Sequence, residues 1–466
     1  MNPEPRRNRG GIRAYPVVAG VVLATAGLFG GRVVLRTIAP VENTANGADA
    51  AAPAPGGAQS TWRVVDTGQT QCYDDLGVPG CPAAGQPCYG QDAQYAGVPF
   101  GFEAAANGRV VHDRQTGLTW TRHMMRDECD VRSRARFTHD EASAFVERLN
   151  VQGYGGFRDW RIPSIKELYS LIHFQGHSRR GTAYLDTAVF EFQFGDEVET
   201  ASPAGAPRPP HPIDAQFWSS TPYAGLTFGD NPTVFGVNFA DGRIKGYPAG
   251  PGPDGVPPPA QLMLRLVRGP AYGINRFEDR GDGTVADVAS GLMWTREDSG
   301  APMSWPDALA YAEACTCAGY NDWRLPNAKE LQSIVDYTRA PDAADAGRRG
   351  PAIDPVFRVS SPGSEPWYWT STTHVEAHLP GEPEGTFAVY VSFGRAIGRP
   401  HGATLDVHGA GAQRSDPKRP PAAEDQPVTL GPQADELRGT NYVRCVRTIV
   451  TRPPASSGQR APHARP

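Results

Sequence analysis

Residues 319–331 read GYNDWRLPNAKEL and residues 156–168 read GFRDWRIPSIKEL, so the chain carries one pattern twice. Glycine, an aromatic residue, Asp-Trp-Arg, an aliphatic residue, proline, a capping residue and Lys-Glu-Leu recur in the same order. Self-similarity of this kind is typical of tandem units built on one plan. We therefore predict a first repeat over residues 101–269 and a second repeat over residues 270–450.

Each copy of the pattern predicts a corner at which a strand turns into a helix. Gly319 permits a tight turn at positive φ, and Pro326 pushes the residue before it toward an extended conformation. Asn327 and Ser164 are good N-caps, and each is followed three residues later by glutamate, which is a capping-box pattern. Apolar residues then recur at helical spacing, so a core-facing helix is expected to start at each cap.

The corner residues admit two interpretations. Asp-Trp-Arg followed at once by a core helix is typical of a buried tryptophan whose charged neighbours satisfy backbone groups or each other. The alternative is a binding site with an aromatic platform and two charges. We favour the structural interpretation for the motif residues, which are Asp159, Trp160, Arg161, Pro163, Glu167, Asp322, Trp323, Arg324, Pro326 and Glu330.

Matching blocks on both sides of the corner complete each repeat. Alternating residues at 111–120 and 285–294, with glycine in the turn, predict β-hairpins. Thr138 and Ser304 are expected to cap the helices that follow, and each repeat ends on a predicted strand. We predict an α+β fold of two tandem repeats. Each has two helices, a mixed and mostly antiparallel sheet whose closing strand returns beside the opening one, and long proline-rich loops.

The N-terminal end points to export. Four arginines within the first 13 residues precede an uncharged stretch at 14–31, so residues 1–31 are expected to be either a signal peptide or a membrane anchor. Residues 32–60 are rich in Ala, Pro and Gly and predict a disordered linker, and a disordered tail is expected at 451–466. The bulk of the chain is therefore expected in the periplasm or at the cell surface, either free or tethered to the inner membrane.

The leader at 61–100 holds three cysteines, Cys72, Cys81 and Cys88. In an exported segment their spacing favours a disulfide clip over a metal site, because paired C-x-x-C or histidine partners are missing. Cys129 is a candidate fourth member of this group.

The second repeat holds cysteines that the first repeat lacks. When the two copies are aligned on the corner, Gln152 and Tyr154 stand opposite Cys315 and Cys317, and Leu266 stands opposite Cys445. The first repeat thus lacks both sides of a pair at once. A disulfide from Cys445 to Cys315 or to Cys317 is therefore expected.

Four blocks together resemble the bacterial Lcl C-terminal domain family: GTVADVASGLMW at 283–294, AGYNDWRLPNAKEL at 318–331, YWTST at 368–372 and YVRCVR at 442–447. The resemblance is weaker in the first repeat. It implies a C-type-lectin-like fold, in a group that also holds the formylglycine-generating sulfatase-modifying enzymes. The founding example is similar to an adhesin that binds sulfated glycans, so the resemblance implies ligand binding outside the cytoplasm.

An insertion in the first repeat, residues 122–136, concentrates arginine. Five arginines stand against three acidic residues, and the net charge of +2 suits bidentate contacts with an anionic glycan or a phosphate. The candidate ligand-binding residues are Arg122, Arg126, Arg132, Arg134 and Arg136. The alternative is an ordinary solvated run of charges.

No cofactor or metal is expected, and bound calcium is the open alternative. Asp279, Asp282 and Asp287 supply oxygen atoms near a turn, but the first repeat keeps only Asp113 of that set. An aspartate shared by both repeats is more typical of a side chain that caps its own turn.

Composition and motifs narrow the function. The net charge of −5 argues against nucleic-acid binding, and the common catalytic signatures are missing. We expect a non-catalytic binding protein of the bacterial cell envelope that recognises an anionic glycan or envelope polymer. One alternative is a structural or assembly component that binds an envelope protein. Another is an oxidoreductase of the formylglycine-generating type, which would need a free thiol at Cys445.

Overall fold

The computed structural model describes most of the chain beyond residue 60, within the unit that begins at Pro55. The described residues are 61–126, 136–195, 200–201, 207–208, 213–250, 259–360, 365–378, 381–421 and 428–449. The predicted signal or anchor, the linker and the tail lie outside these ranges. No helix within them is long and apolar enough to cross a membrane.

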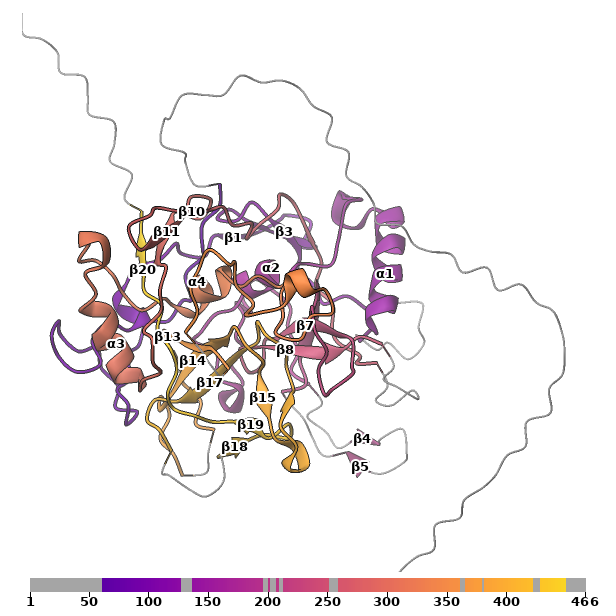
Figure 1. Cartoon of the computed structure of the whole chain (residues 1–466). Helices are drawn as coiled ribbons and strands as arrows, with labels where there is room; N and C mark the ends of the chain where they lie inside the picture. Colours follow the sequence, from indigo (N-terminus) through magenta and orange to yellow (C-terminus); the bar gives the residue numbers. More distant parts are fainter. Residues whose placement is uncertain are drawn as a thin grey trace, which may run out of the picture. The chain divides into compact units, whose positions relative to one another are not determined.

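Each repeat carries a four-stranded antiparallel sheet that joins its two ends (Figure 1). In the first repeat it is β1 (Phe102–Ala104), β2 (Val110–Asp113), β3 (Thr119–Thr121) and β9 (Val267–Arg268). In the second it is β10 (Phe277–Asp279), β11 (Thr284–Asp287), β12 (Leu292–Thr295) and β20 (Val446–Thr448). Trp120 pairs with Val267, and Trp294 pairs with Val446. The predicted hairpins and returning closing strands are confirmed.

The two repeats also build one six-stranded antiparallel sheet together, in the order β13-β14-β17-β8-β7-β6. The first repeat supplies β6 (Gln216–Pro222), β7 (Thr233–Asn238) and β8 (Arg243–Pro248). The second supplies β13 (Trp367–His374), β14 (Phe387–Ser392) and β17 (Gln413–Pro417). The halves meet where Gln413 pairs with Ile244. The repeats are therefore continuous with each other through backbone hydrogen bonds.

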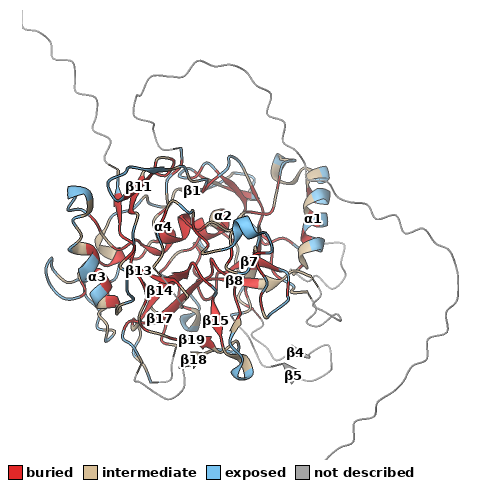
Figure 2. Cartoon of the chain, in the orientation of Figure 1, coloured by how far each residue is buried: buried red, intermediate tan, exposed pale blue. Residues whose placement is uncertain are grey.

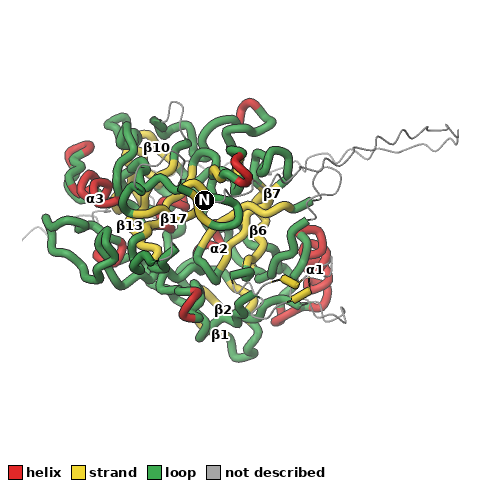
Figure 3. The backbone as a smooth tube through the Cα atoms, turned by 90° about the horizontal axis from the view of Figure 1, so that it is seen from below, coloured by secondary structure: helices red, strands yellow, loops and turns green. Residues whose placement is uncertain are grey.

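The described part of the chain has four α-helices, which flank these sheets: α1 (His139–Gln152), α2 (Ile165–Ser170), α3 (Trp305–Glu313) and α4 (Ala328–Ser333). All four begin at the predicted caps, and Ser164 and Asn327 form full capping boxes with the glutamate three residues later. Helices α2 and α4 contact each other and the shared sheet. Helices α1 and α3 lie at opposite ends of the folded body (Figures 1 and 3), and each has an exposed outer face (Figure 2).

The remaining elements are short. A sheet in the order β16-β15-β19-β18 is confined to the second repeat and consists of β15 (Ile397–Gly398), β16 (Leu405–Asp406), β18 (Thr429–Leu430) and β19 (Asp435–Glu436). Strands β4 (Thr200–Ala201) and β5 (Pro207–Arg208) pair in the first repeat. The 3-10 turns are η1 (Asp92–Gln94), η2 (Tyr154–Gly156), η3 (Ser178–Arg180), η5 (Cys317–Gly319), η6 (Ala346–Arg348) and η7 (Pro400–Gly402).

Apolar side chains form one shared core and one satellite cluster in each repeat. The shared core joins Leu168 of α2 to Leu331 of α4, together with Trp120 and Trp294 of the outer sheets. Each satellite lies under α1 or α3 and includes the corner tryptophan of its own repeat. Because most of the buried apolar surface is common to both repeats, neither repeat keeps its full core without the other.

The corner tryptophans are buried as predicted, but the Asp and Arg beside them pair with side chains outside the Asp-Trp-Arg triplet and not with each other. Trp160 and Trp323 are each only 2% exposed. Asp159 and Asp322 pair with closing-strand arginines, Arg268 at 2.7 Å and Arg447 at 2.6 Å. The motif arginine forms a bidentate ion pair with the helix glutamate in both copies, over 2.6 Å in Arg161–Glu167 and 2.5–2.6 Å in Arg324–Glu330. The charges therefore tie the corner to the strand and helix beside it.

The cysteine-containing leader contacts both repeats. The Thr67 carbonyl accepts a hydrogen bond from the Phe174 amide of the first repeat. Gln69 exchanges two side-chain hydrogen bonds with the Thr373 backbone of the second repeat, at 2.8 and 2.9 Å. The buried Asp92 carboxylate accepts hydrogen bonds from the hydroxyls of Thr67 and Thr372 at 2.7 and 2.5 Å. The leader is thus part of the folded body.

Candidate functional site

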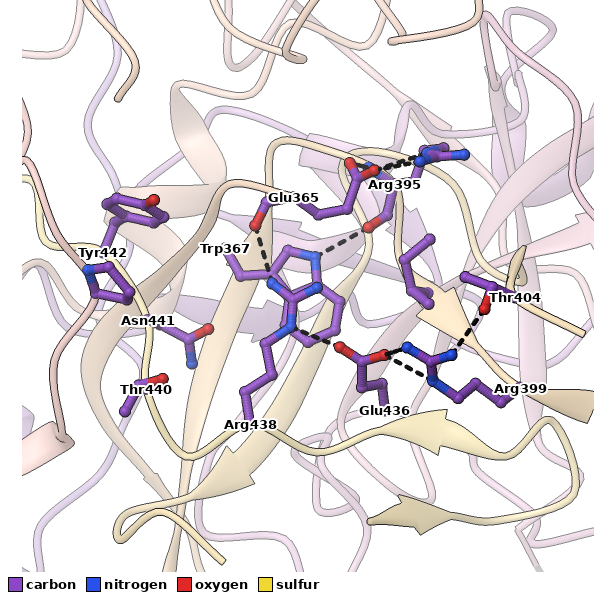
Figure 4. A pocket seen from close by; sticks show the side chains of 12 residues that line it. Glu365, Trp367, Arg395, Arg399, Thr404, Glu436, Arg438, Thr440, Asn441 and Tyr442 are labelled. Atoms are coloured by element: carbon purple, nitrogen blue, oxygen red, sulfur yellow. Dashed lines mark hydrogen bonds and ion pairs between the residues drawn. The ribbon is translucent and has the colours of Figure 1, made fainter. Parts of the chain in front are cut away.

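A cavity of about 440 Å³ opens in the second repeat beside the small β15–β19 sheet (Figure 4). Its charged walls come from residues just before β13, on either side of β15, at the end of β19 and between β19 and β20. The lining residues are Pro302, Glu365, Trp367, Arg395, Ile397, Arg399, Thr404, Glu436, Arg438, Thr440, Asn441 and Tyr442. Three arginines and two glutamates give the lining a net charge of +1.

Arg395 forms one side of the cavity. Its guanidinium binds the Glu365 carboxylate at 2.6–2.7 Å, and its backbone amide donates to the same carboxylate at 2.7 Å. Burial lowers the pKa of Arg395, but the hydrogen bonds and charge of Glu365 outweigh it and raise the pKa overall. The arginine therefore keeps its charge while its side chain remains 46% exposed.

Glu436 holds the two arginines on the other side. Its carboxylate accepts hydrogen bonds from Arg399 at 2.7 and 3.0 Å and from Arg438 at 3.0 Å. The Arg438 guanidinium also donates to the Glu365 carbonyl at 2.9 Å, so it spans the floor between both glutamates (Figure 4). These contacts fix the guanidinium groups before any ligand arrives.

Trp367 packs behind the arginines of the cavity and contacts two of them. It is fully buried, stacks on Tyr390 with ring centres 4.8 Å apart, and lies 3.5 Å from the Arg438 guanidinium carbon. Its indole nitrogen donates to the Arg395 carbonyl at 2.9 Å. The tryptophan thus orients two of the arginines and offers no open face to a ligand.

The cavity retains unused donors and an acceptor. A guanidinium has five N–H groups, and within the described ranges Arg395 NH1 and Arg438 NH2 make no hydrogen bond. Asn441 Oδ1 is buried without a partner among the described residues, while its Nδ2 donates to Asp416. Guanidinium donors suit an anionic group, and an amide oxygen suits a hydroxyl.

The first repeat lacks the main parts of this cavity. Gln216 stands at the position of Trp367, two residues before the strand tryptophan that both repeats share. In the described part of the first repeat no sheet corresponds to β16-β15-β19-β18. The cavity is thus an addition of the second repeat. Its charged residues lie outside the duplicated pattern, so the pattern does not predict them. Glu365 and Arg395 lie 30 residues apart and Arg399 and Glu436 lie 37 residues apart, with no motif to connect the partners of either pair.

The predicted arginine insertion is only partly described, because Arg132 and Arg134 lie outside the described ranges. Arg122 donates to the Val189 carbonyl at 3.0 Å, and Arg126 pairs with Glu191 at 3.3 Å. Arg136 instead donates to the Asp214 carbonyl at 2.5 Å. The structure therefore directs Arg122 and Arg126 to one segment and Arg136 to another.

The carboxylates of Asp282 and Asp287, which were candidate calcium ligands, accept hydrogen bonds from protein donors. Asp287 is fully buried and accepts from Arg276 N, Asn275 Nδ2 and Ser290 Oγ at 2.6–2.9 Å. Asp282 accepts from the amide and hydroxyl of Thr284. Across the described ranges, no group of three or more His, Cys, Asp or Glu residues could hold a metal ion. The shared aspartate caps its turn, as predicted.

The disulfide predicted among the leader cysteines is present between two of the three. Cys72 and Cys81 form a disulfide. Cys88 is a correction to the prediction: it is a buried free thiol, packed into the satellite core of the second repeat. Cys129 lies outside the described ranges. The expected disulfide from Cys445 to Cys315 or to Cys317 is a second correction, because all three residues are free thiols in the structure. The side chains of Cys315 and Cys445 are instead joined by a hydrogen bond.

The geometry defines a duplicated α+β protein whose halves share one sheet. The model of the Lcl C-terminal domain family matches residues 109–268 and 283–407, one segment in each repeat and together more than half of the chain. The chain therefore belongs to the Lcl C-terminal domain family. No curated protein and no solved structure matches it. The second segment ends before Glu436 and Arg438, so the matched region contains only part of the cavity.

Proposed function

We propose that this protein is an exported, non-catalytic binding protein of the bacterial cell envelope that recognises an acidic sugar unit of a glycan or envelope polymer. The observation that carries the proposal is the 440 Å³ cavity with three preorganised arginines. A carboxylate or sulfate group would accept from the free donors of Arg395 and Arg438.

Several features support binding rather than catalysis. Each of the five charged side chains of the cavity is held in an ion pair with another. Such pairing fixes the charge and shape of the cavity, which suits recognition of an anionic group. The expected C-type-lectin-like fold and export through residues 1–31 are parts of the same proposal, and both rest on the family resemblance and the N-terminal sequence.

The test is binding of the purified chain to matched acidic and neutral glycans. Arg395→Ala is expected to weaken acidic-glycan binding at least tenfold, because its side chain is the most exposed of the three cavity arginines. Binding should also weaken as salt is raised. Arg348→Ala is the control, since Arg348 is 60% exposed and its one ion pair among the described residues is with the nearby Asp345.

Three outcomes would reject the cavity as the site. Equal binding of neutral and acidic glycans would remove the role of charge. An unchanged affinity in Arg395→Ala would remove the role of the cavity. A loss confined to the combined change of Arg132, Arg134 and Arg136 to alanine would move the site to the insertion. Co-purification with an envelope protein and no glycan binding would favour the assembly role instead.

A further inference from the structure

Two cysteines of the second repeat meet at the end of α3. Cys315 follows this helix, and its amide donates to the Ala312 carbonyl at 3.2 Å. Cys445 directly precedes β20, and its carbonyl accepts from the Thr295 amide at 3.0 Å. Separate elements therefore hold the two backbones, and the side chains meet in a hydrogen bond between the sulfur atoms.

The two thiols differ in access and in acidity. Cys445 is 1% exposed, whereas Cys315 is partly exposed. The hydrogen bond from Cys445 lowers the pKa of Cys315 to about 6, and the same bond together with burial raises the pKa of Cys445. The negative end of the α3 dipole opposes a thiolate here, so the Cys445 thiol, with a smaller contribution from the Cys317 backbone amide, is what stabilises it. An accessible thiolate backed by a buried thiol is the arrangement that disulfide exchange needs.

Cys317 is close in sequence but is held differently. Its sulfur lies 3.6 Å from the Gly283 carbonyl oxygen, against the turn between β10 and β11. Its own carbonyl accepts from the Trp323 indole at 3.0 Å. Cys317 is therefore a matched control, since it is a partly exposed thiol two residues from Cys315 that lacks the hydrogen bond to Cys445.

The first repeat shows that the corner does not require this pair. Gln152 and Leu266 occupy the corresponding positions, and the corner contacts of the first repeat are the same as those of the second. The first repeat therefore forms the same corner without the two cysteines. We infer that Cys315 and Cys445 have a role other than holding the corner together.

We propose that Cys315 and Cys445 form a dithiol site that reacts with a low-molecular-weight disulfide. The Cys315 thiolate attacks one sulfur of the disulfide, forms a mixed disulfide and releases the other half as a thiolate, which takes a proton from water. Cys445 then loses its proton to water and attacks the Cys315 sulfur, releasing the second half. The chain loses two electrons to form the Cys315–Cys445 bond, and the disulfide is reduced to two thiols.

The full-length reduced protein is treated with oxidised glutathione at pH 7 and followed by intact mass and peptide mapping. The wild type should form the Cys315–Cys445 bond and carry no adduct on either residue. Cys445→Ser and, as a second variant, Cys445→Ala should keep glutathione on Cys315, because the resolving thiol is gone. Cys317→Ser should behave as the wild type, and circular dichroism checks that each variant is folded.

The reverse step separates an exchange site from a permanent bond. Reduced glutathione should open the Cys315–Cys445 bond in the folded wild type. A bond that opens only after denaturation would overturn the proposal, as would glutathione on Cys317 in place of Cys315. Unreacted thiols at both Cys315 and Cys445 would overturn it as well. None of these outcomes depends on glycan binding.

Discussion

Lys166 of the first repeat donates a hydrogen bond from Nζ to the carbonyl oxygen of Ser333, the last residue of α4, over 2.6 Å. The second repeat makes the equivalent contact with the first: Lys329 donates to the carbonyl of Ser170, the last residue of α2, over 2.8 Å. Each ammonium thus lies at the negative end of the other repeat's helix. The lysine of the duplicated Lys-Glu-Leu sequence joins the two repeats.

The chain has only four lysines, Lys166, Lys245, Lys329 and Lys418, and none is exposed. Lys166 donates to three acceptors, in Gly273, Asn275 and Ser333, and Lys418 donates to Tyr73, Asp74 and Thr373. A compact ammonium with three donors suits such clusters of acceptors. Arginine fills buried sites of the same kind, since Arg265 and Arg444 are fully buried and each donates to three backbone carbonyls.

Replacing either bridging lysine should destabilise both repeats together. Lys166→Met and Lys329→Met should each lower the free energy of unfolding by about 1–3 kcal/mol, because buried carbonyls lose their donor. Chemical denaturation measures the change, and Arg348→Met, which removes an exposed cation, should stay within about 0.5 kcal/mol of the wild type. A similarly small effect at both lysines would show that these contacts do not stabilise the junction.

The buried lysines should resist modification. Burial lowers the pKa of Lys329 and of Lys418 to about 7, so a substantial fraction of each amine is neutral and nucleophilic near neutral pH. A succinimidyl ester should nevertheless label the folded chain only at its N-terminal amine, and should reach all four lysines after denaturation. Mass spectrometry counts the labels. Rapid labelling of Lys329 or Lys418 in the folded protein would contradict their burial.

The two copies of the corner ion pair should differ in strength. Arg324 is 14% exposed, whereas the equivalent Arg161 is 39% exposed. Glu330→Gln should cost about 3 kcal/mol of unfolding free energy, because it leaves a buried guanidinium without its counter-charge. Glu167→Gln should cost clearly less, since water solvates Arg161. Equal costs, measured by urea denaturation of both variants, would refute the comparison.

Asp92 should make stability depend on pH. Burial raises its pKa from 3.8 to about 7, although the Thr372 and Thr67 hydroxyls act in the opposite direction. The folded state therefore holds a proton that the unfolded state releases, so this stabilisation is complete below pH 3.8 and is lost as pH rises to about 7. Asp92→Asn should match the wild type near pH 4 and be more stable by about 2–4 kcal/mol at pH 8. A difference independent of pH would rule out this titration.

Local pattern was enough to predict the elements of each repeat but not how the repeats join. The hairpins, caps and closing strands follow from residues close in sequence, such as Asn327 with Glu330. The shared sheet rests on β8 meeting β17, and strands β7 and β14 are buried on both faces, so no alternation reveals their neighbours. The cavity escaped prediction because Glu365 and Glu436 belong to segments without a counterpart in the first repeat.

The central claim is that residues of both repeats form one folded body through the shared sheet and the bridging lysines. Native-state hydrogen exchange, followed by mass spectrometry as urea is raised, tests it most directly. Amides of β7 and β8 and those of β14 and β17 should exchange with one common free energy of opening and one dependence on urea. Opening of one half of the sheet at lower urea, with the other half still protected, would contradict the account.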